Sequence, residues 1–184
     1  MPAASALSAD YQIYPNGTAY NASIEITGVD RYEFADIGIL GENVAISVDH
    51  VSLSGNCSPC GFNWSKGWGR PSAITFERGN YTVSYMAPLK DNTLQASYKK
   101  QYNVSVQLPA ELDVRNSLLA STSPGANVTR FPDNTTLIQW KKISGFEIRF
   151  YDQWREQILY LFGNIWIVIA IVLLLPFLLV MKRS

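Results

Sequence analysis

Residues 158–180 constrain the chain most strongly, because these 23 consecutive residues contain no charged side chain. At about 1.5 Å per residue, a helix of this length is about 35 Å long, enough to cross the roughly 30 Å hydrocarbon core of a bilayer. A buried core helix is the alternative, but the rest of the chain could not cover its whole circumference. We therefore predict one membrane-spanning helix over residues 152–181, with Asp152 as its N-cap and residues 182–184 as a short basic cytoplasmic tail.

Gly163 and Asn164 interrupt the apolar run in the outer half of this segment. Small residues let two membrane helices approach closely, and an amide can hydrogen-bond between them, which favours lateral assembly through the helix. The alternative is that Asn164 only reaches toward the membrane interface.

Two opposing signals bear on the side of the membrane where the large domain lies. Four cations closely precede the span and two follow it, so the positive-inside rule, applied simply, would place the domain in the cytoplasm. Eight Asn-x-Ser/Thr sequons point the other way, since 12 asparagines and this Ser/Thr content would give about two by chance. They begin at Asn16, Asn21, Asn56, Asn63, Asn80, Asn103, Asn127 and Asn134. We therefore predict a single-pass protein of the cell membrane with a glycosylated N-terminal domain outside.

Residues 10–151 alternate apolar and polar side chains over many short stretches, which is the period of β-strands. We predict a turn at residues 15–17, a central strand at residues 44–53, and hairpins within residues 74–85 and 138–150. Residues 110–119 are ambiguous. The fold class is therefore an all-β ectodomain, an immunoglobulin-like β-sandwich, followed by one C-terminal transmembrane helix. Residues 1–9, rich in Pro, Ala and Ser, are interpreted as the remnant of a signal peptide or a disordered leader.

Cys57 and Cys60 are the only cysteines, and two residues separate them. In an external protein, a disulfide closing this tight loop is the leading interpretation, because a thioredoxin-type motif needs a βαβ setting that the pattern lacks. A metal site would add His50 and Met86, but copper sites in β-sandwich carriers use two histidines and His50 is the only one. We expect no metal and no cofactor, and keep an electron-transfer or metal-handling domain as the alternative function.

Residues 61–71 combine three aromatic rings, three glycines and two cations in one short segment. Trp and Arg of this kind are enriched in interaction hot spots. The candidate binding residues are Phe62, Trp64, Lys66, Trp68 and Arg70. The alternative is that the two Trp rings plug the end of the β-domain.

Composition and motifs argue against nucleic-acid binding and catalysis. The 15 basic and 15 acidic side chains leave no basic excess of the kind that nucleic-acid binders show. The chain contains no glycine-rich phosphate loop, no HExxH and no GxSxG motif, and a Ser/His/Asp triad would depend on His50 alone. We therefore predict no catalytic residues.

Two stretches carry a resemblance to a known family. One combines residues 102–109 (YNVSVQLP) with residues 112–119 (LDVRNSLL), and the other is residues 146–166 (FEIRFYDQWREQILYLFGNIW). They resemble an uncharacterised archaeal family, a domain of unknown function with a membrane anchor, which implies an archaeal cell-envelope setting and no functional residues. The sequence thus predicts a non-catalytic envelope protein, anchored in the lipid bilayer, whose β-domain binds a protein or glycan partner or assembles laterally.

Overall fold

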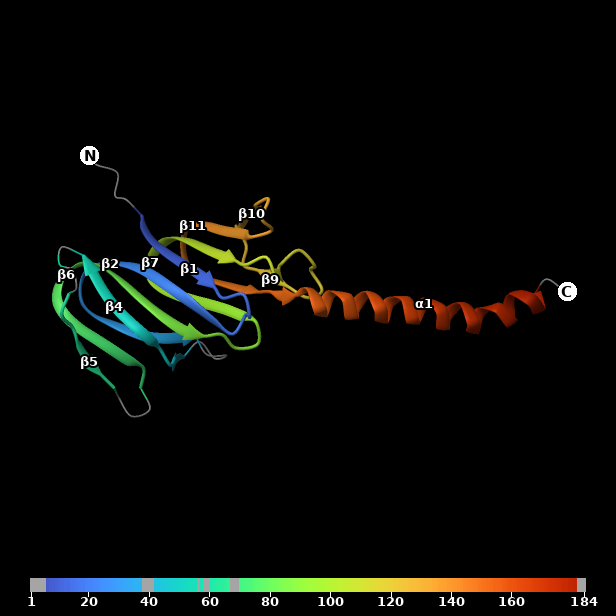
Figure 1. Cartoon of the computed structure of the whole chain (residues 1–184), viewed down its shortest axis with the longest axis horizontal. Helices are drawn as coiled ribbons and strands as arrows, with labels where there is room; N and C mark the ends of the chain where they lie inside the picture. The colour runs from blue at the N-terminus through green and yellow to red at the C-terminus, as the bar shows by residue number, and fades with distance from the viewer. Residues whose placement is uncertain (1–5, 38–41, 56, 58–59, 67–69, 182–184) are drawn as a thin grey trace.

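The computed structural model describes residues 6–37, 42–55, 57, 60–66 and 70–181 and is all-β up to a C-terminal helix (Figure 1). The strands are β1 (Leu7–Ile13), β2 (Ala19–Ile37), β3 (Asn43–Ala45), β4 (Asp49–Gly55), β5 (Asn63–Ser65), β6 (Ser72–Pro88), β7 (Thr93–Leu108), β8 (Leu112–Asp113), β9 (Ser121–Thr122), β10 (Asn127–Arg130), β11 (Thr136–Arg149) and β12 (Tyr151–Asp152), and the helix is α1 (Gln153–Met181). Asn56, Trp68, the first five residues of the predicted leader and the basic tail at 182–184 lie outside the described residues.

Ten strands join in one connected sheet whose main order is β10-β11-β7-β1-β2-β6-β4, with β3 beside β2, β5 beside β6 and β9 beside β11. The central pair β1–β7 is parallel, and the other pairs are antiparallel. Strands β8 and β12 form a separate two-stranded pair. The prediction of an all-β domain followed by one apolar helix is confirmed, whereas an immunoglobulin-like sandwich of two separate sheets is not.

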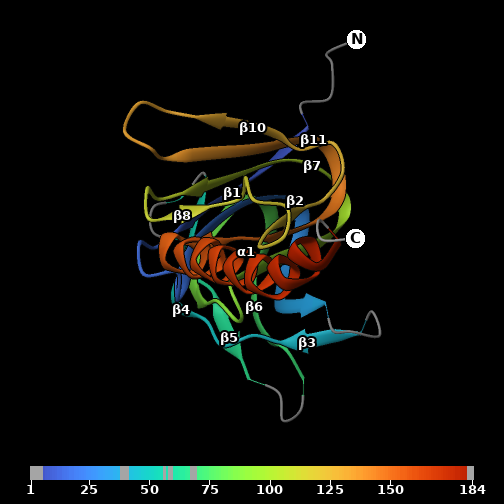
Figure 2. The same cartoon turned by 90° about the vertical axis from the view of Figure 1, so that its right-hand side faces the viewer.

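Four strands are much longer than the usual five or six residues: β2 has 19, β6 has 17, β7 has 16 and β11 has 14. Their pairing shifts register once or twice, in β2–β6 around Gly28 and in β7–β11 around Lys142. Both residues have positive φ, 68° and 53°, as bulged residues often do. Such irregularities bend a strand. Seen from the helix end, β10 and β11 lie at one side of the domain and β4 and β5 at the other (Figure 2), and the strands share one apolar core in which Tyr11 of β1 lies 5.3 Å from Phe146 of β11. Alternate residues of the long strands fill that core, among them Ile24, Val83, Val106, Ile138 and Ile148.

Both predicted hairpins are wrong, because residues 74–85 lie in the single strand β6 and residues 138–149 in the single strand β11. The residues interpreted as a turn, 78–80, instead continue β6 past the register shifts beside Gly28. The Gly28 N–H donates to Asn80 Oδ1 at 3.2 Å, and Arg78 Nε donates to the Gly28 carbonyl at 3.0 Å. Strands β2 and β6 therefore pair on both sides of the irregularity. The sequence of residues 74–85 alone does not show this, because the pairing depends on β2.

The predicted central strand at residues 44–53 is also wrong. It is divided between the short strand β3 and the strand β4, which ends the main order of the sheet. Val44 is 39% exposed, whereas Leu53 is buried. The predicted turn at residues 15–17 is confirmed, with Gly17 at φ 66° and its N–H donating to the Tyr14 carbonyl at 2.9 Å. Strand β1 begins at Leu7, three residues before the predicted domain boundary.

The helix continues directly from the last strand. Asp152 Oδ1 accepts a hydrogen bond from the Arg155 N–H at 2.8 Å, which confirms Asp152 as the N-cap. Just before it, Tyr151 is buried, and its hydroxyl accepts from the Asn116 N–H at 3.3 Å. Beyond the cap, α1 extends away from the β-domain, and it is long and apolar enough to cross a membrane (Figure 1).

We expect Gly28→Ala to lower the free energy of unfolding by about 1–2 kcal/mol, because an L-side chain is strained at φ 68°. A Cβ placed there would meet no atom within 4 Å, so backbone strain is the only cost. Gly28→Asn should lose less, since asparagine tolerates this conformation better. Denaturant unfolding of the full chain in micelles checks both variants, and equal losses would contradict this account of the bend.

Candidate functional site

A cavity of about 470 Å³ opens on the inner face of the bent sheet, at the size of pockets that hold small molecules (about 300–1,000 Å³). Six tyrosines from four strands share its lining. They are Tyr11 of β1, Tyr20 and Tyr32 of β2, Tyr85 of β6, and Tyr98 and Tyr102 of β7. We call this the tyrosine cavity.

Strand alternation explains why these rings converge. On β2, Tyr20, Ile24 and Ile26 point to the inner face, and Tyr32 does so again beyond the bulge at Gly28. Beyond the register shifts, Tyr32 still lines the same cavity, and its ring lies 6.4 Å from that of Tyr85. The corresponding register shift in β7–β11 lies between the partners of Tyr102 and Ser97, next to Tyr98.

The phenol hydroxyls and rings contact one another closely. The hydroxyl oxygens of Tyr11 and Tyr98 lie 2.7 Å apart, within hydrogen-bonding distance. The ring of Tyr98 stacks on that of Tyr102 at 4.4 Å between centroids and 28° between planes. Tyr102 in turn donates its hydroxyl hydrogen to the Glu25 carbonyl at 2.7 Å, so this wall of the cavity is held in a defined geometry.

The opposite wall and the floor are also aromatic. Tyr32 packs edge-on against Phe34 at 5.2 Å, and its ring lies 6.4 Å from that of Tyr85. Tyr20 lies 5.8 Å from Tyr11 and 6.3 Å from Tyr85. Such contacts add to the stability that burial gives each ring.

Burial raises the pKa of the tyrosine hydroxyls in the cavity. For Tyr11 and Tyr85 the pKa lies well above the usual 10.0, with desolvation as the largest cause. Desolvation is also the leading reason that the pKa values of Tyr20, Tyr32 and Tyr98 are raised. The phenols are therefore neutral at physiological pH, where each can both donate and accept a hydrogen bond.

Five charged residues also line the cavity: Arg31, Glu33, Asp36, Lys99 and Lys100. Arg31 and Glu33 form a salt bridge at 2.8 Å. Lys100 Nζ donates to the Thr27 carbonyl at 3.0 Å. Lys99 is exposed next to it.

A second hollow, of about 490 Å³, lies on the outer face of the same strands. Its lining is mostly polar: Asp10, Gln12, Asn21, Ser23, Ser84, Ser105 and Gln107 contribute, together with His50 and Met86. Ser105 Oγ donates to Asp10 Oδ1, and the hydroxyls of Ser23 and Ser84 lie 3.3 Å apart. This groove brings together two of the four residues proposed for a metal site.

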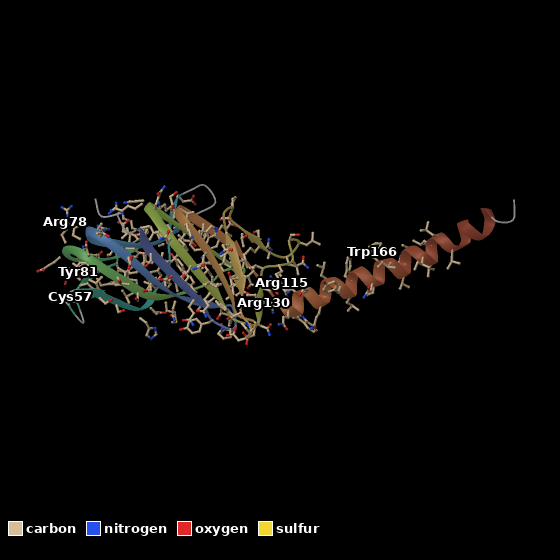
Figure 3. The ribbon with its side chains drawn as sticks, turned by 90° about the horizontal axis from the view of Figure 1, so that it is seen from above. Cys57, Arg78, Tyr81, Arg115, Arg130 and Trp166 are labelled. Atoms are coloured by element: carbon tan, nitrogen blue, oxygen red, sulfur yellow. A yellow bond between two sulfur atoms is a disulfide. The ribbon has the colours of Figure 1, made fainter. Side chains whose placement is uncertain are left out.

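The other two, Cys57 and Cys60, lie apart from the helix at the far end of the domain (Figure 3). Their sulfurs lie at disulfide-bonding distance, with Cα atoms 5.1 Å apart. Disulfide sulfurs provide no thiolate ligand. In this form the four predicted ligands do not make one site, and the described residues contain no cluster of three or more His, Cys, Asp or Glu suited to a metal.

The predicted binding segment does not project as a free loop. Asn63–Ser65 form β5, which pairs with β6, and Phe62 is half-buried against the core. Trp64 stacks on the buried ring of Phe34 at 5.4 Å and 23°, yet 42% of it is exposed. Lys66 and Arg70 are exposed. Trp64 thus combines the two predicted alternatives, since one ring face packs on the domain while much of its surface reaches solvent.

Seven of the eight sequon asparagines lie in the described part of the chain, and each of the seven is exposed. Asn16 lies in the first turn, and Asn80 lies in β6, paired with Thr27 of β2. Their side chains accept hydrogen bonds from backbone N–H groups through Oδ1, from Thr18 and Gly28 respectively.

Sequence reasoning missed the tyrosine cavity. A signal was present, since the chain has ten tyrosines and several occupy apolar positions of the alternating pattern. Only the bent pairing shows that six of them line an open space.

Comparison with known proteins gives one match. The model of a family described as "Family of unknown function (DUF5803)" matches residues 70–182. No curated protein matches the chain.

We expect Trp64→Ala to lower the free energy of unfolding by about 1–2 kcal/mol, less than the 3–5 kcal/mol typical of a fully buried tryptophan. The reason is that stacking on Phe34 is lost while the exposed part of the ring changes little. Lys66→Ala on the same surface is the control and should change stability by less than about 0.5 kcal/mol. Denaturant unfolding measures the loss. A loss of 3 kcal/mol or more would show that Trp64 acts only as a structural plug of the β-domain.

Stability should decline as the pH rises above about 10, the ordinary tyrosine pKa. An acid whose folded-state pKa is raised keeps its proton in the fold, whereas the unfolded chain releases it, so alkaline pH favours unfolding. Unfolding free energies measured from pH 8 to 12 check this dependence. Tyr98→Phe should make the decline shallower, and an unchanged slope would show that the cavity tyrosines do not cause it.

Proposed function

This chain belongs to DUF5803, a family of unknown function, and we propose that it is a membrane-anchored binding protein of the cell envelope. In this proposal α1 holds the protein in the bilayer. The β-domain lies outside the cytoplasm and recognises a partner without transforming it. The archaeal setting is part of the proposal and rests on the resemblance of residues 102–119 and 146–166.

The tyrosine cavity is the observation that carries the proposal. Protein cores are packed to the density of organic crystals, and an unfilled space lowers stability. A domain that served only as a spacer would be more stable with side chains filling this space. The sheet nevertheless leaves about 470 Å³ open between the tyrosine rings. An open, largely preformed aromatic cavity is typical of a binding site.

The chemistry of the cavity favours binding over catalysis. A general base or nucleophile works best with a pKa near the operating pH. The tyrosine pKa values here move in the opposite direction, because burial disfavours the phenolate. The lining thus offers neutral hydrogen-bonding groups and ring faces, which suit recognition.

The exposed sequons and the cysteine pair support the outer location. All seven described sequon asparagines are accessible to a glycosylating enzyme, and disulfides persist in oxidising compartments outside the cytoplasm. The half-exposed Trp64, with Lys66 and Arg70, provides a second surface on which a protein or glycan partner could rest. Lateral assembly through Gly163 and Asn164 is compatible with the outer location and with partner binding at Trp64.

Labelling of intact cells of the native host with a membrane-impermeant amine reagent tests the orientation. Lys66, Lys90, Lys99, Lys100, Lys141 and Lys142 are all exposed on the β-domain. We expect peptide mass spectrometry to find these lysines labelled and Lys182 unlabelled until the cells are lysed. Intact mass should also exceed that of the bare polypeptide, with Asn16 and Asn80 among the glycosylated sites.

The reverse pattern would reject the proposal. If Lys182 is labelled in intact cells while the six domain lysines are protected, the domain lies in the cytoplasm. Labelling of every lysine after lysis is the matched control, because it shows that protection came from the membrane and not from burial.

A further inference from the structure

The tyrosine cavity offers a ligand an unusual combination of aromatic faces and hydroxyl groups. Tyr32 and Tyr98 are each partly exposed, while the floor residues Tyr11, Tyr20 and Tyr85 are nearly buried. A ligand that enters therefore meets the rings and hydroxyls of Tyr32 and Tyr98 before it reaches the floor. Ile24 and Ile26 add apolar surface between them.

Charge does not dominate this cavity. Its phenols are neutral, and the nearby cations Arg31 and Lys100 already have partners within the protein, Glu33 and the Thr27 carbonyl. A bound phosphate group would call for several converging cations or backbone N–H groups. The centre of the cavity presents tyrosine hydroxyls and not such cations or N–H groups.

A purely apolar ligand fits equally poorly. In a phenol pair such as Tyr11–Tyr98 only one hydroxyl donates, so the other O–H still needs an acceptor. A lipid tail would remove water from this remaining donor without replacing its hydrogen bond, which costs about 1–3 kcal/mol for each buried group left unpaired. The matching ligand has an apolar face for a ring and several hydroxyls at its edge. A pyranose has this form, because its C–H groups gather on its faces and its hydroxyls lie around its rim.

We propose that the tyrosine cavity binds one saccharide residue, with its hydroxyls hydrogen-bonded to the phenols of Tyr32 and Tyr98 and one face covering an aromatic ring. This inference rests on the proposed binding function and names its ligand class.

The test uses the full chain in nanodiscs of phosphatidylcholine, produced in a host that attaches no N-glycans, so that no sugar comes from lipid, detergent or protein. The probes are the methyl pyranosides of glucose, galactose, mannose and glucuronic acid. Ligand-observed NMR titration measures binding. We expect at least one pyranoside to bind saturably, with Tyr32→Phe and Tyr98→Phe each weakening it about 2- to 10-fold through loss of one hydrogen bond.

Tyr81→Phe is the matched control. Tyr81 lies on β6 like Tyr85, but its ring packs against Phe76 at 5.1 Å and it is not one of the residues that line the cavity. Its loss of a hydroxyl should leave sugar binding unchanged. All three substitutions keep the ring, so the variants should fold, which thermal unfolding verifies.

Two outcomes would overturn the inference: no saturable binding of any of the four pyranosides by the folded protein, or binding that Tyr32→Phe and Tyr98→Phe leave unchanged. Either result together with the expected lysine-labelling pattern rejects the saccharide and leaves the anchored, outer location intact. A reversed labelling pattern rejects the proposed function whatever the sugars do.

Discussion

A single sheet has to bury one of its faces, and in this protein the described residues place no helix and no second large sheet against that face. The sheet therefore packs against itself. Four strands of 14 to 19 residues make this possible, because each is long enough to contribute to both halves of the bent surface. The bend at Gly28 and the bend at Lys142 are consequently as important to the fold as the apolar core that they close.

The tyrosine cavity is a consequence of this bending. Where the two halves of the sheet approach, large rings hold the walls apart, and their hydroxyls bond to each other or to backbone, as Tyr11 with Tyr98 and Tyr102 with Glu25. The same burial that stabilises the rings keeps their hydroxyls protonated. The stability of the fold and the proposed binding chemistry thus depend on the same side chains.

The anchor is connected to this domain without a flexible segment. Strand β12 pairs with β8 and leads at once into α1, and Asp113 in β8 accepts hydrogen bonds from Arg115 and forms an ion pair with Arg130, close to the start of the helix (Figure 3). Although burial opposes the charge of Asp113, its hydrogen bonds with Arg115 hold the pKa of this carboxyl below its usual range.

The sequence by itself determined the features that depend on neighbouring residues: the apolar helix and its cap at Asp152, the inward alternation along each strand, the turn at residues 15–17 and the closeness of Cys57 to Cys60. It also indicated membership of a family of unknown function. Only the tertiary structure decided whether residues 78–80 reverse the chain or continue a strand past a register shift. The same residue types suit a turn and an irregular strand, so the pairing with β2 makes the difference. Tyr11 and Tyr98 meet for the same reason: they are 87 positions apart, and the pairing of β1 with β7 that brings them together leaves no local trace in either segment.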